Sequence, residues 1–241
     1  MSKRRFLISG SLKTDQVVDL PSEEAAHARK VLRLKKDDLV ELMNGRGLMA
    51  LAQINRVDKK QVSCLVRKTW QKPRPLPKLV LCCGLIKGGN MDLLAQKFTE
   101  LAVDEVRPFE SLRSVKKLKN PTERIERWER IAGQALKQCG AAHPPAFMPP
   151  AEYTEILEAA PPQAGKVMLY ENQEHKTLAQ VLTELKDKQE IWALVGPEGG
   201  FSSQEAIWAE EAGFIQAGLP HVILRAETAC LTLASLVRFR L

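Results

Sequence analysis

Short apolar stretches separated by polar turns characterise the first seventy residues of the chain. They lie at residues 39–44, 48–57 and 62–66. The first two flank Asn44-Gly45-Arg46-Gly47, a hairpin signal, because Asn and Gly tolerate the positive φ angles of tight turns. Before them, residues 21–28 are expected to form a short helix capped by Ser22. Several short strands with tight turns predict a small β-barrel.

A proline-rich stretch at residues 71–78 (QKPRPLPK) follows this β-rich part. Closely spaced prolines favour an extended, semi-rigid linker. We therefore expect two domains, residues 1–72 and residues 73–241.

The second part alternates strand and helix patterns. The unbroken apolar run at residues 79–86 is typical of a strand that is buried on both faces. A helix capped by Asn90 would bury one side, and a second helix would begin with Pro121 at its first position. The buried side of the first is Met91, Leu94, Phe98 and Leu101, and that of the second is Ile125, Trp128, Ala132, Ala135 and Leu136. Further strands are expected at 166–170, 191–195 and 221–224, with a last helix at 228–239. The pattern predicts an α/β domain with a mostly parallel sheet.

Residues 191–205 (IWALVGPEGGFSSQE) combine a buried strand, a loop and a helix start. Pro197 cannot donate to a sheet, and Gly199-Gly200 allows close approach of a ligand. Ser202 with Glu205 fits a capping box. Because ligands bind at the carboxyl ends of parallel strands, this loop is a candidate site.

Two other loops follow predicted strands, one at Tyr170-Glu171-Asn172 and one at residues 224–228. In a parallel sheet all three could meet at one edge and form a pocket. The simpler interpretation is an ordinary Gly/Pro turn with solvated charges beside it. The sequence contains no P-loop, GxGxxG after a strand, GxSxG or HExxH motif, which argues against common nucleotide-, hydrolase- and zinc-dependent classes, and no metal is expected.

The chain is basic, with 36 Lys plus Arg against 29 Asp plus Glu, a net charge of +7 and a pI near 9.2. This balance fits either a polyanionic partner, nucleic acid first, or simply a basic soluble protein. Few aromatic residues accompany the basic clusters, so phosphate contacts are expected rather than base stacking. The clusters are Lys3-Arg4-Arg5, Arg29-Lys30 with Arg33, Lys35-Lys36, and Arg113 with Lys116, Lys117 and Lys119.

Five cysteines, an odd number without metal-ligand spacing, suggest reduced thiols. No signal peptide or long apolar segment is evident, so we expect a cytoplasmic protein with no membrane association.

An ordered set of motifs resembles the bacterial 16S ribosomal RNA uridine-N3 methyltransferase family of the SPOUT superfamily. The most specific are LVGPEGGFSSQE at residues 194–205 and ILRAETACLTLASL at 223–236. KGGNMDLLAQKFTELAVDEVRP at 87–108, LRSVK at 112–116 and WERIAGQALKQCG at 128–140 match the same domain, and RRFLI at 4–8 with HARKVLRLKKDDLVELMNGRG at 27–47 match a PUA-like domain. The resemblance covers nearly the whole chain.

The resemblance implies a fold that general topology rules would have excluded. A SPOUT α/β trefoil-knot domain would follow a small β-rich PUA-like barrel, and the protein would be a homodimer acting on 16S ribosomal RNA of the small subunit. It places S-adenosyl-L-methionine in the strand-end loops, at Tyr170, Glu171, Val195, Gly196, Pro197, Glu198, Gly199, Gly200, Leu219, Leu224, Ala226 and Thr228. It assigns RNA phosphates to Arg5, Arg29, Lys30, Arg33 and Arg113.

Methyl transfer to uridine N3 requires loss of the N3 proton, because the protonated nitrogen is a poor nucleophile. Arg225 could stabilise the resulting anion, and Glu227 could accept the proton. Alternatively, Glu227 only stabilises the last helix or holds Arg225.

Two arginines common in the family are absent, because Ala141 follows Gly140 and Val222 precedes Ile223. The target preference is therefore open. The alternatives are a SPOUT methyltransferase acting on another RNA, such as transfer RNA, and a catalytically idle RNA-binding or ribosome-assembly protein.

Overall fold

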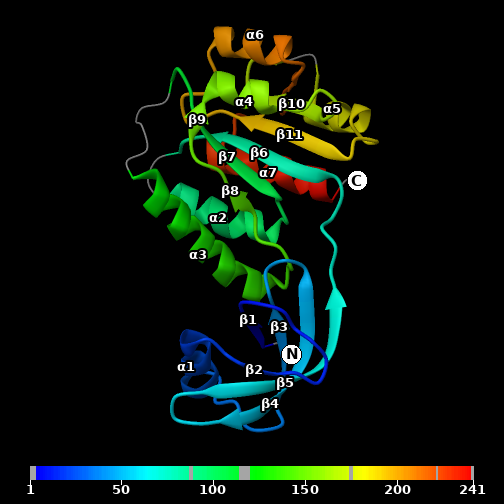
Figure 1. Ribbon diagram of the computed structural model, residues 1–241. Helices are drawn as coiled ribbons and strands as arrows, with labels where there is room; N and C mark the ends of the chain where they lie inside the picture. Colours follow the sequence, from blue (N-terminus) through cyan, green and yellow to red (C-terminus); the bar gives the residue numbers. More distant parts are fainter. Residues whose placement is uncertain (1–3, 87–88, 114–119, 174–175, 221, 240–241) are drawn as a thin grey trace. The chain divides into compact units, whose positions relative to one another are not determined.

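The computed structural model describes residues 4–86, 89–113, 120–173, 176–220 and 222–239 (Figure 1). Lys3, Lys87, Gly88, Lys116, Lys117, Lys119 and His221, which the sequence analysis singled out, lie outside the described residues. The chain divides into two compact units, residues 1–74 with 133–144, and residues 75–132 with 145–241. The first therefore includes a segment far along the chain that no pattern in the sequence indicated.

The N-terminal unit is built on a five-stranded sheet with strand order β1-β3-β4-β5-β2. Its elements are β1 (Arg5–Leu7), β2 (Val17–Asp19), α1 (Ser22–Lys30), β3 (Leu39–Met43), β4 (Leu48–Val57) and β5 (Val62–Gln71). β1 pairs with β3 in parallel, whereas the other pairs are antiparallel. The sheet forms a half-barrel around buried Phe6, Leu42, Ile54 and Val66.

The predicted hairpin between β3 and β4 is confirmed, with Met43 opposite Met49. The Asn44 carboxamide oxygen accepts the backbone N–H groups of Arg46 at 2.8 Å and Leu48 at 3.1 Å, and Gly45 has φ 70°. The Ser22 cap is wrong: Ser22 is the first residue of α1, Pro21 occupies the cap position, and no side chain bonds there.

The C-terminal unit is a doubly wound sheet with all its strands parallel, in the order β12-β10-β11-β6-β7-β8, with β9 also paired to β7. The strands are β6 (Lys78–Gly84), β7 (Glu105–Glu110), β8 (Ala146–Phe147), β9 (Ala151–Glu152), β10 (Gly165–Leu169), β11 (Glu190–Val195) and β12 (Ile215–Ala217). The helices are α2 (Asn90–Glu100), α3 (Pro121–Cys139), α4 (Tyr153–Ala159), α5 (Leu178–Glu184), α6 (Ser203–Glu211) and α7 (Ala226–Arg238), and α3 belongs to the N-terminal unit from residue 133 onward.

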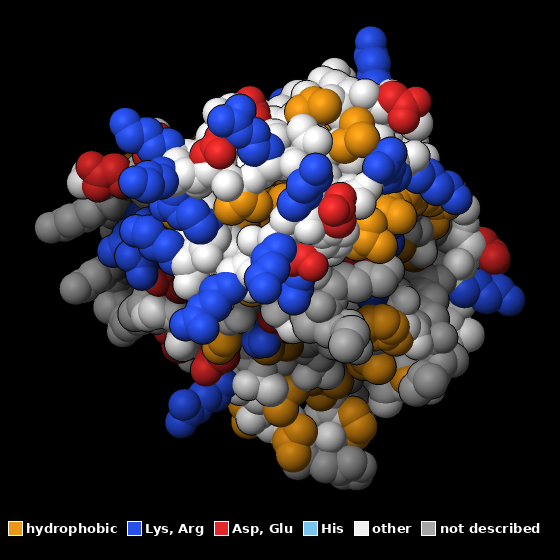
Figure 2. Space-filling view, turned by 90° about the horizontal axis from the view of Figure 1, so that it is seen from below, with side chains coloured by type: hydrophobic (Ala, Val, Ile, Leu, Met, Phe, Trp, Pro, Cys, Tyr) orange, Lys and Arg blue, Asp and Glu red, His pale blue; other side chains and the backbone are white. Residues whose placement is uncertain are grey.

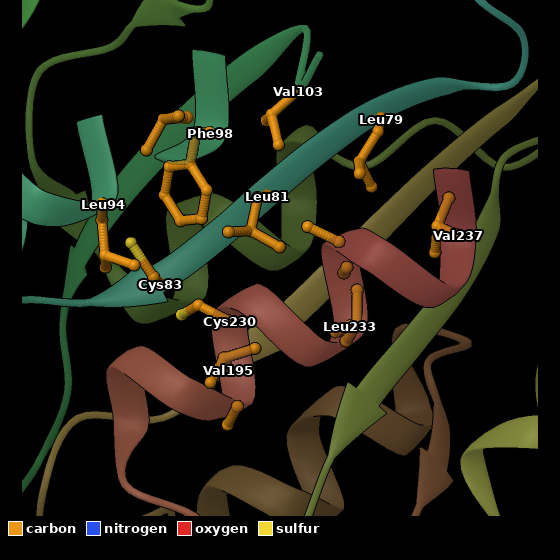
Figure 3. Packing of buried hydrophobic residues seen from close by; sticks show 14 of the residues in the cluster. Leu79, Leu81, Cys83, Leu94, Phe98, Val103, Val195, Cys230, Leu233 and Val237 are labelled. Carbon is orange, nitrogen blue, oxygen red and sulfur yellow. The ribbon is translucent and has the colours of Figure 1, made fainter. Parts of the chain in front are cut away.

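Alternate residues of the central strands enter two separate cores, as the pleat requires. Leu79, Leu81 and Cys83 of β6 face a core shared with α2, α5 and α7, whereas Val80 and Cys82 face one shared with α4 and α6. In Figure 3, Cys230 of α7 lies beside Cys83, with Leu233 and Val237 further along the same helix. The sheet is therefore covered on both faces, which explains the unbroken apolar run in the sequence.

Three sequence expectations in this unit were wrong. Residues 222–224 form no strand; the last strand in the described part of the chain is β12, and Val222 and Ile223 are exposed. Asn90 is the first residue of α2, with Gly89 at the cap position and no side-chain cap. The last helix begins at Ala226 rather than Thr228. Two apolar residues in sequence were thus not enough to distinguish a strand from an exposed loop.

A buried ion pair holds the end of α7. Arg238 contacts the Asp104 carboxylate, and both side chains are 3% exposed. The same carboxylate accepts the Leu79 backbone N–H at 2.8 Å, so it also connects to β6. These contacts connect the end of α7 to β6 through Asp104, and removal of either partner of the pair would leave a buried charge uncompensated.

Candidate active site

The loop after β11 packs tightly against the neighbouring strand. Gly196 and Pro197 are buried, and the Gly200 N–H donates to the Pro197 carbonyl at 2.9 Å in a turn with φ 65° at Gly200. A Cβ on Gly84, the last residue of β6, would lie 2.4 Å from the Pro197 nitrogen. Glycine at position 84 therefore lets the loop lie directly on the sheet.

The helix after this loop begins as predicted. Ser202 caps α6, with its hydroxyl accepting the Glu205 N–H at 3.2 Å, and the Glu205 carboxylate accepts the Ser202 N–H at 2.8 Å. This reciprocal capping box satisfies two N–H groups that a helix start leaves without partners. The cap thereby fixes where the glycine loop ends.

The loop after β10 approaches both the glycine loop and the end of β12. A Cβ on Gly200 would lie 2.1 Å from a carboxylate oxygen of Glu171, and a Cβ on Gly218 would lie 2.0 Å from the Gln173 carbonyl oxygen. The Tyr170 N–H donates to the Ala217 carbonyl at 3.0 Å. Two glycines thus permit close contact between three loops.

The third segment leads into α7. Arg225 occupies the cap position in an extended conformation (φ −62°, ψ 152°) and is exposed, while Glu227 lies in the first turn. The Arg225 side chain makes no cap hydrogen bond, and its carbonyl accepts the Ala229 N–H at 2.8 Å. The carboxylate of Glu227 is placed where the helix dipole favours negative charge.

One pocket of about 930 Å³ joins the three loops. Of the predicted site residues, Tyr170, Glu171, Val195, Gly196, Pro197, Glu198, Gly199, Gly200, Leu219, Leu224, Arg225, Ala226 and Glu227 line it. Thr228 is exposed and is not part of its wall. Asn90, Lys176, Thr177 and Gly218 also line it, although the sequence analysis did not include them. The sequence feature that could have pointed to Asn90 as a pocket residue is the Gly88-Gly89 pair directly before it.

The charge lining the pocket differs from that of the whole chain. Among the residues that the structure describes, its carboxylates are Glu171, Glu198 and Glu227, against the cationic Lys176 and Arg225. Lys176 also binds Glu184 at 2.8 Å. In a chain with a net charge of +7, a pocket with more carboxylates than cations favours a ligand that carries positive charge.

The five arginines and lysines predicted to bind RNA have different surroundings. Arg29 donates to the Asp58 carbonyl at 3.1 Å and is half-buried, whereas Lys30 and Arg33 are exposed. Arg113 is exposed and donates to the Gly199 carbonyl at 3.1 Å, so it contacts the glycine loop itself.

The Arg5 side chain is held by hydrogen bonds within the N-terminal unit. Its guanidinium binds the Glu41 carboxylate at 2.9 Å and donates to the carbonyls of Lys137 at 3.1 Å and Gln138 at 2.9 Å. A Cβ on Gly140 would lie 2.8 Å from this guanidinium. Arg5 therefore caps the end of α3 within the N-terminal unit, and this geometry favours a structural role over an RNA contact.

Figure 2 shows many Lys and Arg side chains at the surface, with acidic side chains between them. Such a surface suits a polyanion bound mainly through its phosphates.

Three buried thiols are held in their neutral form. Burial raises the pKa of Cys64 to about 12 and raises that of Cys82, and a hydrogen bond with Cys83 together with burial raises the pKa of Cys230. A neutral buried thiol is a poor nucleophile. These cysteines therefore serve as small core residues.

Two family models match the chain. One, described as an RNA methyltransferase domain, covers residues 72–238, and the other, an RNA methyltransferase PUA domain, covers residues 20–67. The chain therefore belongs to the RNA methyltransferase family, and the fold class is confirmed as a SPOUT domain preceded by a PUA-like domain.

Two relatives that align with nearly the whole chain carry the same protein name. The Bacillus subtilis "Ribosomal RNA small subunit methyltransferase E" is 30% identical over 98% of this chain and 96% of its own length, and the protein of the same name from Rickettsia conorii is 29% identical over 99% and 96%. The resemblance found in the sequence is confirmed.

Two solved structures are similar over almost the whole chain. A Legionella pneumophila methyltransferase in complex with the cofactor SAM is 27% identical, with a TM-score of 0.87, over 99% of this chain and 98% of that one. The Neisseria gonorrhoeae ribosomal RNA small subunit methyltransferase E bound to S-adenosyl methionine is 29% identical, with a TM-score of 0.85, over 98% and 97%.

Proposed function

We propose that the protein transfers the methyl group of S-adenosyl-L-methionine to N3 of a uridine in 16S ribosomal RNA of the small subunit. The observation that carries this proposal is the pocket where the glycine loop, the Glu171 loop and the Arg225–Glu227 segment meet. The names of the full-length relatives and the cofactor in two similar structures support the substrate class and the cofactor.

The pocket suits this cofactor. The glycine loop would hold the adenosine part through its backbone, because Gly196, Gly199 and Gly200 line the pocket without side chains. Leu169, Val195 and Leu224 would supply apolar contacts. The excess of carboxylates suits a cationic sulfonium. When bound, the cofactor supplies an electrophilic methyl group.

The residues at the start of α7 would prepare the uridine. Arg225, which is exposed at the pocket wall, would stabilise negative charge on a base oxygen as N3 loses its proton. Glu227, also on the wall and two residues further along the chain, would accept that proton. The protein's contribution is thus positioning, charge stabilisation and removal of one proton.

Mapping modified nucleosides by mass spectrometry, with and without the gene, tests the proposal most directly. We expect loss of N3-methyluridine from 16S ribosomal RNA in the deletion strain and its return with the purified protein and cofactor. Loss of a modification from transfer RNA instead would identify another RNA as substrate. Unchanged RNA together with no cofactor binding would indicate an idle RNA-binding or assembly protein.

We propose that residues 1–72, which make up most of the N-terminal unit, form an RNA-binding domain that would hold RNA phosphates with Arg29, Lys30 and Arg33. We expect Arg33→Ala to weaken RNA binding about equally for different sequences and to reduce the salt dependence of log K by about one unit. Filter binding across a salt series measures both. The contrasting variant is Arg5→Ala, which should lower thermal stability because it removes the contacts with Glu41 and α3. An unchanged salt slope for Arg33→Ala would remove Arg33 from the interface.

We also propose a homodimer that works in the cytoplasm, where the ribosomal substrate is found; cell fractionation tests the location. Ile223 is 87% exposed and Val222 58% exposed, beside the pocket, which fits burial against a second copy. Ile223→Asp should shift the protein from dimer to monomer in analytical ultracentrifugation, whereas Ile207→Asp, at another exposed apolar position (48%), should leave the dimer intact. A wild-type monomer would contradict the dimer.

A further inference from the structure

A buried carboxylate lies behind the proposed cofactor loop. Glu205 of α6 is 0% exposed. One of its oxygens, Oε2, accepts the N–H and the hydroxyl of Ser202, both at 2.8 Å. The other, Oε1, accepts the backbone N–H of Leu112 at 2.9 Å, across 93 residues of sequence. Helix capping explains the first oxygen but not the second.

The second contact leads back to the glycine loop. Leu112 follows β7, and its neighbour Arg113 donates from Nη1 to the Gly199 carbonyl at 3.1 Å. A Cβ on Gly199 would lie 3.3 Å from the Arg113 Cβ, so the two segments are in close contact. The Ser111 hydroxyl accepts the Arg113 N–H at 3.1 Å, which fixes the local turn. A continuous series of contacts therefore leads from Glu205 through Leu112 and Arg113 to Gly199.

We propose that Glu205 is a positioning residue for the cofactor: it holds Leu112 and Arg113 against the outer side of the glycine loop, and so sets the position of Gly199. This inference rests on the proposed function and extends it. Arg113, predicted from the sequence as an RNA contact, then acts on the cofactor loop as well. RNA that binds the exposed Arg113 would thereby influence the affinity for the cofactor.

The chemistry of a carboxylate suits this role. Glu205 accepts hydrogen bonds at both oxygens, whereas an amide of the same shape has only one accepting oxygen and an NH₂ group. Glu205→Gln would therefore leave either the Leu112 N–H or the Ser202 N–H facing another donor. Because an unsatisfied buried N–H is costly, the Leu112 segment is expected to move away from the loop.

Calorimetry of S-adenosylmethionine binding without RNA tests the inference. We expect Glu205→Gln to weaken binding about tenfold. Ser202→Ala, the control, removes only the capping hydroxyl and leaves the Leu112 bond, so its loss should stay below about threefold. Leu112→Pro removes the accepted N–H at a side chain that is 68% exposed, and it should reproduce the loss caused by Glu205→Gln.

A double-mutant cycle separates positioning from general destabilisation. Arg113→Ala alone should weaken cofactor binding about threefold, and it should cause no further loss in a protein that already carries Glu205→Gln, because the two residues act through the same contact. If the affinity losses of Arg113→Ala and Glu205→Gln multiply in the double variant, the inference is overturned. Wild-type affinity in both Glu205→Gln and Leu112→Pro would also overturn it. A wild-type protein that binds no S-adenosylmethionine would overturn the proposed function as well, and this is measured first.

Discussion

Replacing Gly84 by alanine is expected to weaken S-adenosylmethionine binding by about 100-fold or more. The added Cβ would lie 2.4 Å from the nitrogen, 2.5 Å from Cδ and 2.9 Å from Cα of Pro197. These atoms belong to backbone and to a closed ring, so no side-chain rotation relieves the overlap. The glycine loop must move away from β6, and a displacement of about 1 Å in a binding site can cost about 100-fold.

Calorimetry measures the affinity, and circular dichroism shows whether the variant is folded. The matched control is Gly133→Ala, because a Cβ on Gly133 would meet Leu7 at an ordinary 3.7 Å and alanine favours the helix. Gly133→Ala should bind the cofactor as the wild type does. A folded Gly84→Ala protein with unchanged affinity would show that the cofactor does not use this loop.

Gly84 illustrates a limit of prediction from sequence. The loop containing Gly199 and Gly200 was identified because glycine, proline and a capping box follow a buried strand, and such local signals are visible along the chain. Gly84 looked like any residue at the end of an apolar run. Its importance comes from contact with Pro197, more than a hundred residues away, and no periodicity reports that contact.

The difference between local sequence signals and contacts between distant residues also explains the outcome at other elements. The β3–β4 hairpin was predictable because its turn residues fix the pairing locally. The strand expected at residues 221–224 was wrong because β12 begins earlier and is defined by parallel pairing with β10. The RNA contact of Arg5, which the resemblance implies, stays a prediction, whereas its hydrogen bonds to carbonyls of α3 join distant parts of the sequence and follow from no local pattern. The net charge indicated a polyanionic partner, whereas contacts such as those of Arg5 depend on the fold.

Arg225→Ala is expected to reduce the rate of methyl transfer by about 100- to 1,000-fold while leaving cofactor affinity within about twofold. Arg225 is exposed and makes no side-chain cap, so its removal should not disturb α7. A charge that acts on the base as N3 loses its proton contributes mainly in the transition state, and its loss therefore lowers kcat more than it weakens binding.

Single-turnover methylation at saturating cofactor measures this rate, and calorimetry measures the affinity. Arg225→Lys keeps the positive charge and should retain more activity than Arg225→Ala. Because alkaline solution itself favours loss of the N3 proton, the rate of Arg225→Ala should rise more steeply with pH than that of the wild type. Glu227→Gln separates the two interpretations of Glu227. If Glu227 accepts the proton, the variant should lose most of its methyl-transfer rate. If Glu227 only stabilises α7, the variant should lose mainly thermal stability. A near-normal rate in Arg225→Ala would exclude this arginine from the mechanism and direct the search to Lys176, the other cationic side chain that lines the pocket among the described residues.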